Sequence, residues 1–236
     1  MKRKLSAQLA LPEIFSEKET VRVCQLHEYK EIALSLAISF WDDPVARYFL
    51  DTSDTTNWST KQKWNLHVSL MEAMVCMHII DGMVTTIGDN YGCVALWMPP
   101  GADGDSFATL LRSGMWKLHF QLSRIGRDRW FNYFFPELHH VKHHTLQERD
   151  DDSWYLVYLG TRPEARRKGY ARRVLEDIMT RADREGRAVY LESSKAMNVP
   201  IYEKFGFEKR ERMEMPEADG SIIPLEIMVR EPQSTV

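Results

Sequence analysis

The alternation of apolar and polar residues predicts strands near both ends of the chain and in its middle. Val21 and Val23 alternate with polar neighbours, and similar runs flank the turn-forming residues 89–92. Residues 153–160 form a nearly continuous apolar run, which is typical of a central strand covered on both faces. We expect strands over residues 20–26, 83–87, 93–98, 153–160, 188–192, 207–215 and 222–229.

Between these strands, apolar residues three and four positions apart predict amphipathic helices. Ser59-Thr60 is suited to cap a helix whose apolar stripe includes Trp64 and Met71, and Gly82 is suited to end it. The aromatic-rich stretch over residues 106–144 is also helical in pattern and is too long for a simple connection. We expect the capped helix between Ser59-Thr60 and Gly82, further helices over residues 29–41, 169–186 and 199–205, and a helical insertion over residues 103–150.

The order of these elements predicts an α/β fold. The strand, helix and strand within residues 153–192 form a βαβ crossover, so these two strands are expected to be parallel. The turns at residues 89–92 and 219–220 predict antiparallel hairpins. Together they predict a mixed, mainly antiparallel twisted sheet with helices on both faces.

The length and composition suit a single domain over residues 1–236, because 236 residues with 44% hydrophobic content can bury one sizeable core. A formal net charge of -3 provides no basic field, so nucleic acid is not an expected partner. The three cysteines, Cys24, Cys76 and Cys93, lack metal-ligand spacing and suit a reducing compartment.

No stretch of the sequence has the length of a membrane span. The longest apolar run, residues 68–80, is interrupted by Glu72 and His78 and is far shorter than the roughly 20 residues that a bilayer requires. The basic start is followed by charged residues rather than by an apolar signal segment, so residues 1–19 are expected to form an N-terminal arm. We therefore expect a soluble cytoplasmic protein without a membrane partner, as a monomer or a homodimer.

A basic turn separates the central apolar strand from the helix that follows it. Its residues are Arg166, Arg167, Lys168, Gly169, Tyr170 and Ala171. The first turn of a helix leaves backbone N–H groups free and carries the positive end of the helix dipole. A glycine lets a phosphate approach the backbone, and the basic side chains add charge. The turn is a candidate site for two linked phosphates, although alone it is also typical of a solvated basic surface.

The spacing Arg-x-x-Gly-x-Ala resembles the GNAT superfamily of coenzyme A-dependent N-acetyltransferases. Flanking residues strengthen the resemblance: Leu159-Gly160-Thr161-Arg162-Pro163 precedes the turn, and Asn198-x-x-x-Tyr202-Glu203-Lys204-Phe205-Gly206-Phe207 follows it. The similarity covers residues 154–215 well, extends to residues 20–98 only in the order of elements, and does not explain residues 106–144. It implies a GNAT-type sheet with acetyl-CoA as cosubstrate.

The resemblance also implies where coenzyme A would bind. Backbone N–H groups of residues 166–171 would hold the pyrophosphate, and pantetheine would pair strand-fashion with Leu159, Gly160 and Thr161. Asn198 would reach pantetheine or cap the following helix. A glycine within an apolar strand indicates a bulge, a close backbone approach or simply the end of the strand. With a bulge, a freed N–H of Leu159 would polarise the thioester carbonyl.

Two residues are candidates for the acid and the base of acyl transfer. Tyr202 stands where the family often has a tyrosine that protonates the departing sulfur, and a phenol of pKa about 10 can serve a thiolate of pKa roughly 8.5. Glu192, near the end of the strand that adjoins the acyl site, is the candidate base for the attacking amine. Each also has a structural interpretation, Tyr202 as a core residue and Glu192 as a surface residue.

Two further features have no clear place in this chemistry. The histidine pairs within residues 139–144 lie one helical turn apart, but no carboxylate or third ligand accompanies them, so no metal is expected. The aromatic residues between Trp116 and Phe135 form either a packed subdomain core or a lid that lines a pocket for a hydrophobic amine.

We therefore expect an acetyl-CoA-dependent N-acetyltransferase in which a primary amine attacks the thioester directly. The long insertion favours a small-molecule amine as the acceptor. One alternative is acetylation of a protein lysine or N-terminus, which needs an open groove. Another is a non-catalytic acyl-CoA-binding module, which needs the glycine turn but neither Tyr202 nor Glu192.

Overall fold

The computed structural model describes residues 19–102 and 106–234, which form a seven-stranded sheet in the order β1-β2-β3-β4-β5-β7-β6. Within it, β4 and β5 pair in parallel and the other neighbours are antiparallel. The predicted mixed, mainly antiparallel sheet is therefore confirmed. The strands are β1 (Arg22–Val23), β2 (Met83–Ile87), β3 (Cys93–Met98), β4 (Trp154–Thr161), β5 (Val189–Ser193), β6 (Glu208–Pro216) and β7 (Ile222–Arg230).

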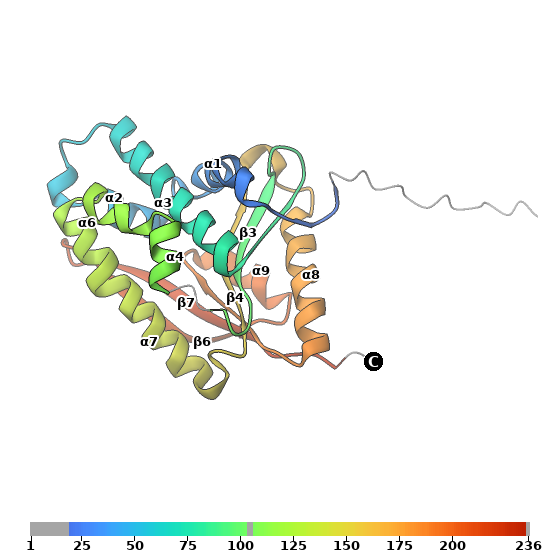
Figure 1. The fold of residues 1–236 in the computed structure, drawn as a ribbon. Coiled ribbons are helices and arrows are strands. Elements are labelled where there is room, and N and C mark those ends of the chain that lie inside the picture. The colour runs from blue at the N-terminus through green and yellow to red at the C-terminus, as the bar shows by residue number, and fades with distance from the viewer. Residues whose placement is uncertain (1–18, 103–105, 235–236) are drawn as a thin grey trace, which may run out of the picture.

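Helices make most of the connections between strands (Figure 1). They are α1 (Tyr29–Phe40), α2 (Pro44–Leu50), α3 (Thr60–Asp81), α4 (Phe107–Arg112), α5 (Leu118–Gln121), α6 (Arg124–Asp128), α7 (Phe135–Leu146), α8 (Tyr170–Glu185) and α9 (Val199–Glu203). A π-helical segment, Arg129–Phe134, joins α6 to α7. Ser59 caps α3 as predicted, because its hydroxyl accepts a hydrogen bond from the Gln62 N–H at 3.3 Å.

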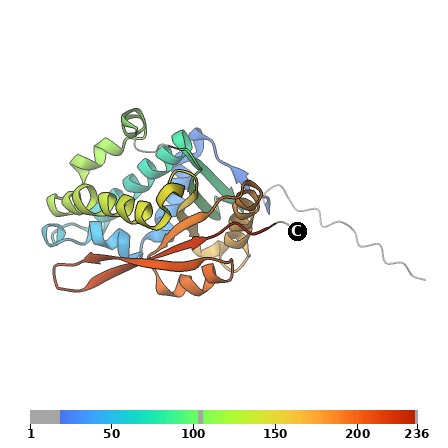
Figure 2. The same ribbon diagram turned by 90° about the horizontal axis from the view of Figure 1, so that it is seen from below.

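The helices cover both faces of the sheet (Figure 1, Figure 2). On one face, Leu36 of α1 and Val75 of α3 pack in a cluster that includes Leu96 of β3. On the other face, Val174 of α8 packs in a second cluster that includes Trp97 of β3. Leu96 and Trp97 belong to different clusters because successive side chains of a strand point to opposite faces.

The sheet opens between its two central strands. The parallel pairing of β4 with β5 stops at Leu156 and Leu191 in the described ladder, while β4 continues beside β3. A bulge in β4 leaves Val157 without a partner on β3. A bulge turns two consecutive side chains to one face, and accordingly both Val157 and Tyr158 face the α3 side. The candidate site lies at this opening.

The structure corrects several predicted boundaries. β1 has two residues rather than the seven of residues 20–26, because the chain enters a 3-10 turn at Leu26–Glu28. The Asp43-Pro44 pair, shortly after the end of α1, starts α2, a helix that the hydrophobic pattern did not indicate. Asp43 is its N-cap and Pro44 lies in its first turn.

The predicted insertion is helical, since α4 to α7 all lie between β3 and β4. The predicted arm of residues 1–19 lies outside the described residues except for Glu19. Among the helices that the structure describes, none is both long enough and apolar enough to cross a bilayer.

Candidate active site

The basic glycine turn lies at the start of α8. Gly169 is the N-cap of this helix and has a left-handed backbone with a φ of 76°, which glycine adopts without strain. A Cβ placed there would meet no atom within 4 Å, so the space in front of the turn is open. Arg166, Arg167 and Lys168 are exposed beside it.

The backbone donors of this turn are arranged as an anion cradle. The Arg173 N–H donates to the Gly169 carbonyl at 3.1 Å, so the N–H groups of Tyr170, Ala171 and Arg172 precede the intrahelical hydrogen bonds. The Tyr170 side chain is buried in the cluster beneath α8, so this residue can serve an anion only through its backbone. An open, donor-rich helix N-terminus fits a pyrophosphate.

Leu159, Gly160 and Thr161 form the part of β4 that lies beyond its divergence from β5. In the described part of the chain, the β5-facing edge of these residues has no strand partner, so a ligand chain can pair with it. A Cβ on Gly160 would lie 2.9 Å from Leu36 Cδ2, so the glycine allows close approach of α1.

Of the alternatives given for Gly160, the structure shows the close backbone approach and no bulge. The bulge lies at Val157, next to the divergence, and Leu159 stays in register with β3. The bulge and the glycine thus lie at different positions of β4. The bulge turns side chains toward one face, and the glycine gives room to α1. The proposed contact of the Leu159 N–H with a thioester stays a prediction.

Tyr202 lies on α9, on the α8 side of the sheet. Its ring packs edge-on against Phe207 with 5.7 Å between centroids. Burial raises the pKa of Tyr202 to about 12, and the nearby Cys93 thiol adds to this. Cys93 is the cross-strand partner of Thr161, which places Tyr202 near the free end of β4. The phenol therefore keeps its proton at neutral pH and can donate it.

Asn198 ends a 3-10 turn immediately before α9, and its side chain makes no capping hydrogen bond. The capping prediction is wrong because the Asn198 backbone is already helical, with φ -84° and ψ -23°, whereas a capping side chain needs a non-helical backbone. A contact of its amide with pantetheine stays a prediction.

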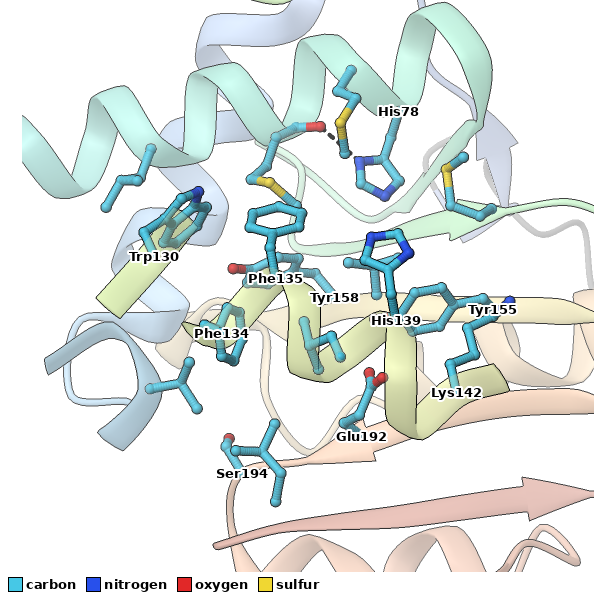
Figure 3. Close-up of a pocket in the computed structure, with 18 of the residues that line it drawn as sticks. His78, Trp130, Phe134, Phe135, His139, Lys142, Tyr155, Tyr158, Glu192 and Ser194 are labelled. Atoms are coloured by element: carbon cyan, nitrogen blue, oxygen red, sulfur yellow. Dashed lines mark hydrogen bonds between the residues drawn. The ribbon is translucent and has the colours of Figure 1, made fainter. Parts of the chain in front are cut away.

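A cavity of about 580 Å³ lies on the opposite face, between α3, α7 and the diverging strands (Figure 3). Most of its lining side chains are apolar. Both interpretations of the aromatic stretch apply in part: Trp130 and Phe134 are buried and line the cavity, whereas Trp116 and Phe120 are exposed. The π-helical segment carries both lining residues, and such segments often occur at functional sites.

Glu192, near the end of β5, contributes its carboxylate to this cavity beneath α7 (Figure 3). Its Oε1 atom is buried and has no hydrogen-bond partner among the described residues. Burial raises the pKa of Glu192 to about 7, although the hydroxyls of Tyr155 and Tyr190 and the charge of Lys142 oppose this. A carboxylate that is about half ionised near pH 7 is suited to general-base work. Glu192 is therefore not a surface glutamate.

Asp43 shares the cavity and was not expected there. Its Oδ1 accepts a hydrogen bond from the Val45 N–H at 3.0 Å, and its Oδ2 accepts one from the Ser194 hydroxyl at 2.7 Å. Burial raises the pKa of Asp43, and the Ser194 hydroxyl and the Lys195 ammonium oppose this. Only the fold brings Ser194, just after the end of β5, beside Asp43.

His67 and His78 on α3 also line the cavity and are fully buried. His78 Nδ1 lies 2.7 Å from the Met74 carbonyl, and His67 Nε2 lies 3.1 Å from the Ala37 carbonyl. Burial lowers the pKa of each histidine to about 4, so both are neutral at pH 7. The sequence signal for His78 was its position within an otherwise apolar run, whereas His67 lies outside that run.

The histidines of α7 make separate contacts. His143 Nδ1 lies 3.3 Å from Asp150 Oδ2, and His144 Nδ1 lies 3.2 Å from Glu211 Oε1. In the part of the chain that the structure describes, no three His, Cys, Asp or Glu residues are grouped to hold a metal ion.

This fold and site define an acetyltransferase of the GNAT class. Residues 139–209 match the family described as "Acetyltransferase (GNAT) domain". An uncharacterized N-acetyltransferase from Schizosaccharomyces pombe is 42% identical over 207 residues, which cover 88% of this chain and 81% of the relative. The chain belongs to the GNAT superfamily.

Solved structures show the same fold at low sequence identity. A histone acetyltransferase HPA2 and related acetyltransferase from Corynebacterium glutamicum has a TM-score of 0.57 at 19% identity, with 92% of this chain and 98% of that chain covered. Arylalkylamine N-acetyltransferase 2 from Aedes aegypti has a TM-score of 0.56 at 14% identity, with 90% and 98% covered.

Proposed function

We propose that this protein transfers the acetyl group of acetyl-CoA to a primary amine of a small molecule. The observation that carries the proposal is the position of Glu192. Its carboxylate, with a pKa of about 7, lines a mainly apolar cavity where β4 and β5 diverge. An alkyl ammonium of pKa about 10 must lose a proton before it can attack a thioester, and this carboxylate is placed to accept it.

The two candidate proton-transfer groups approach the opening from opposite faces. Glu192 faces the cavity beneath α7, and Tyr202 packs with the cluster beneath α8. In the proposed reaction Glu192 accepts a proton from the ammonium, the neutral amine nitrogen bonds to the acetyl carbon, and the carbon–sulfur bond breaks. Tyr202 gives its proton to the departing sulfur and regains one from the solvent, which takes up the second proton that the nitrogen loses as the amide forms.

Coenzyme A would be held by backbone groups on the α8 side. Residues 166–171 would bind the pyrophosphate at the helix N-terminus, and Leu159, Gly160 and Thr161 would pair with pantetheine. When bound, acetyl-CoA supplies the activated acetyl group, and this chain supplies the orientation and the proton transfers.

The cavity favours a small acceptor over a protein. Its volume of about 580 Å³ is in the usual range for small-molecule sites, roughly 300–1,000 Å³. Trp130 and Phe134 form a wall of it. The fold alone does not identify the acceptor, since structural neighbours are named for histones and for arylalkylamines.

The test is to follow thiol release from acetyl-CoA with a panel of primary amines and, in parallel, with lysine-containing peptides and peptides with a free N-terminus. We expect turnover with amines and none with peptides. Turnover with peptides alone would establish the protein-acetylating alternative.

A thermal melt, together with the turnover assay, distinguishes the proposed enzyme from the non-catalytic binding module. Acetyl-CoA at a hundred times its dissociation constant should stabilise the fold by about 2.7 kcal/mol. Stabilisation without turnover of any acceptor would identify a binding module, and no stabilisation would contradict the coenzyme site itself.

A further inference from the structure

The acceptor cavity contains more unpartnered polar atoms than the proton transfers use. Besides Glu192 Oε1, these are Nε2 of His78, Nδ1 of His67 and Nε1 of Trp130; all are buried and lack a hydrogen-bond partner among the described residues. Buried polar atoms almost always have a partner, so each of these needs an explanation. A bound ligand provides one.

A backbone carbonyl determines which ring nitrogen of His78 carries the proton. Its Nδ1 lies 2.7 Å from the Met74 carbonyl, which can only accept, so Nδ1 is the protonated nitrogen. The ring is neutral, because burial lowers its pKa to about 4. Nε2 therefore has a lone pair and is a hydrogen-bond acceptor. A ligand that satisfies it must present a donor.

His78 lies across the cavity from Glu192. It projects from α3, and its ring points toward α7, whereas Glu192 lies below α7 on the strand side (Figure 3). Met74, Met77 and Met98 line the cavity with it, and the imidazole of His139 on α7 lies between His78 and Glu192 (Figure 3). Because His78 is neutral, a neutral donor satisfies its Nε2 without the cost of burying a charge beside it.

We propose that His78 Nε2 accepts a hydrogen bond from a neutral hydroxyl or N–H group carried by the acceptor, at the end opposite its amino group. The substrate class is a primary amine whose apolar body ends in such a donor. This inference rests on the proposed function, in which Glu192 receives the amino group.

His67 offers a similar acceptor, but two tryptophan rings lie against it. Its Nε2 lies 3.1 Å from the Ala37 carbonyl, which leaves Nδ1 as the acceptor. The rings of Trp41 and Trp64 lie 5.6 and 6.1 Å from its ring. Because these tryptophans occupy two sides of the imidazole, we assign the substrate contact to His78.

The experiment compares two amines that differ by one hydroxyl, phenethylamine and 4-hydroxyphenethylamine. We expect the wild-type protein to have a KM about tenfold lower for the hydroxylated amine, as one hydrogen bond to a buried acceptor can provide. His78→Phe should reduce this ratio to about one. His78→Gln, whose amide carbonyl can accept, should restore part of it. An aliphatic pair, hexylamine and 5-amino-1-pentanol, shows whether the aromatic ring matters.

Control variants exclude general effects. His27→Phe makes the same exchange at an exposed position outside the cavity and should keep the ratio. The assignment would be overturned if the KM ratio were lost in His67→Phe and retained in His78→Phe. It would also be overturned if the wild-type protein distinguished the two amines in neither pair. Circular dichroism and a thermal melt confirm that each variant is folded.

Direct binding separates this inference from the proposed reaction. Calorimetric titration of each amine into the protein with coenzyme A measures the affinity ratio without turnover. A retained, His78-dependent ratio without acetylation would contradict the reaction and support the contact. Acetylation without any dependence of the affinity ratio on His78 would support the reaction and contradict the contact.

Discussion

The coenzyme turn and the acceptor cavity are built in different ways. The turn uses backbone N–H groups of consecutive residues, 166–171, at one end of α8. The cavity uses side chains from α2, α3, α7, β4 and β5, which lie far apart in the chain. The turn is exposed, whereas burial in the cavity raises the pKa of Glu192 and lowers those of His67 and His78. Local backbone geometry thus controls one site and the tertiary environment the other.

The largest expected effect tests the cavity. Glu192→Gln keeps the shape of the side chain but removes the base, so kcat/KM for the amine should fall about a thousandfold while coenzyme affinity is unchanged. Wild-type activity should rise with pH through about pH 7, and the variant should lose this limb. Glu203→Gln, an exposed glutamate on α9, is the control. Full activity of Glu192→Gln would remove it from the base role.

Tyr202→Phe tests the junction of the two sites. Loss of the phenol proton should lower kcat about a hundredfold, with little change in coenzyme or amine binding, because the ring still packs on Phe207. Steady-state kinetics and a coenzyme titration measure the two parts. If kcat is unchanged at every pH, water rather than Tyr202 protonates the sulfur.

A smaller effect tests the turn, and α8 offers a matched pair. Gly169 and Gly186 lie at its two ends with φ values of 76° and 68°, and neither would place a Cβ within 4 Å of another atom. An alanine at either position should cost about 1 kcal/mol of unfolding free energy. Only Gly169→Ala should also weaken coenzyme binding, by about tenfold. Equal affinities in the two variants would contradict the cradle.

The last expected effect is on stability. The pKa of Glu192 is about 7 in the folded protein, above its ordinary value of 4.5, so the folded state holds this proton more tightly. Wild-type stability should therefore fall as pH rises from 4.5 to 7, by up to about 3 kcal/mol from this group. The melting temperature of Glu192→Gln minus that of the wild type should be a few degrees more positive at pH 8 than at pH 4.5. No change of this difference with pH would mean that Glu192 is solvated.

Much of the fold was predictable because periodicity is local. The hairpin strands Met83–Ile87 and Cys93–Met98 have the predicted bounds, and α8 begins and ends at the two predicted glycines. Less was predictable at the site. The bulge at Val157 and the short helix α2 have no distinct pattern in the sequence, because neighbouring strands and helices determine where a strand bends or a turn continues as a helix.

The amino-acid pattern alone determined the order of strands and helices, the parallel pair at the centre of the sheet, and the basic glycine turn, because each depends on residues close together in the chain. The folded arrangement decided which side chains share the cavity. Glu192, Asp43 and His78 come from different elements, and their altered pKa values arise from the loss of water around them. That loss depends on what packs above each residue, which no local pattern specifies.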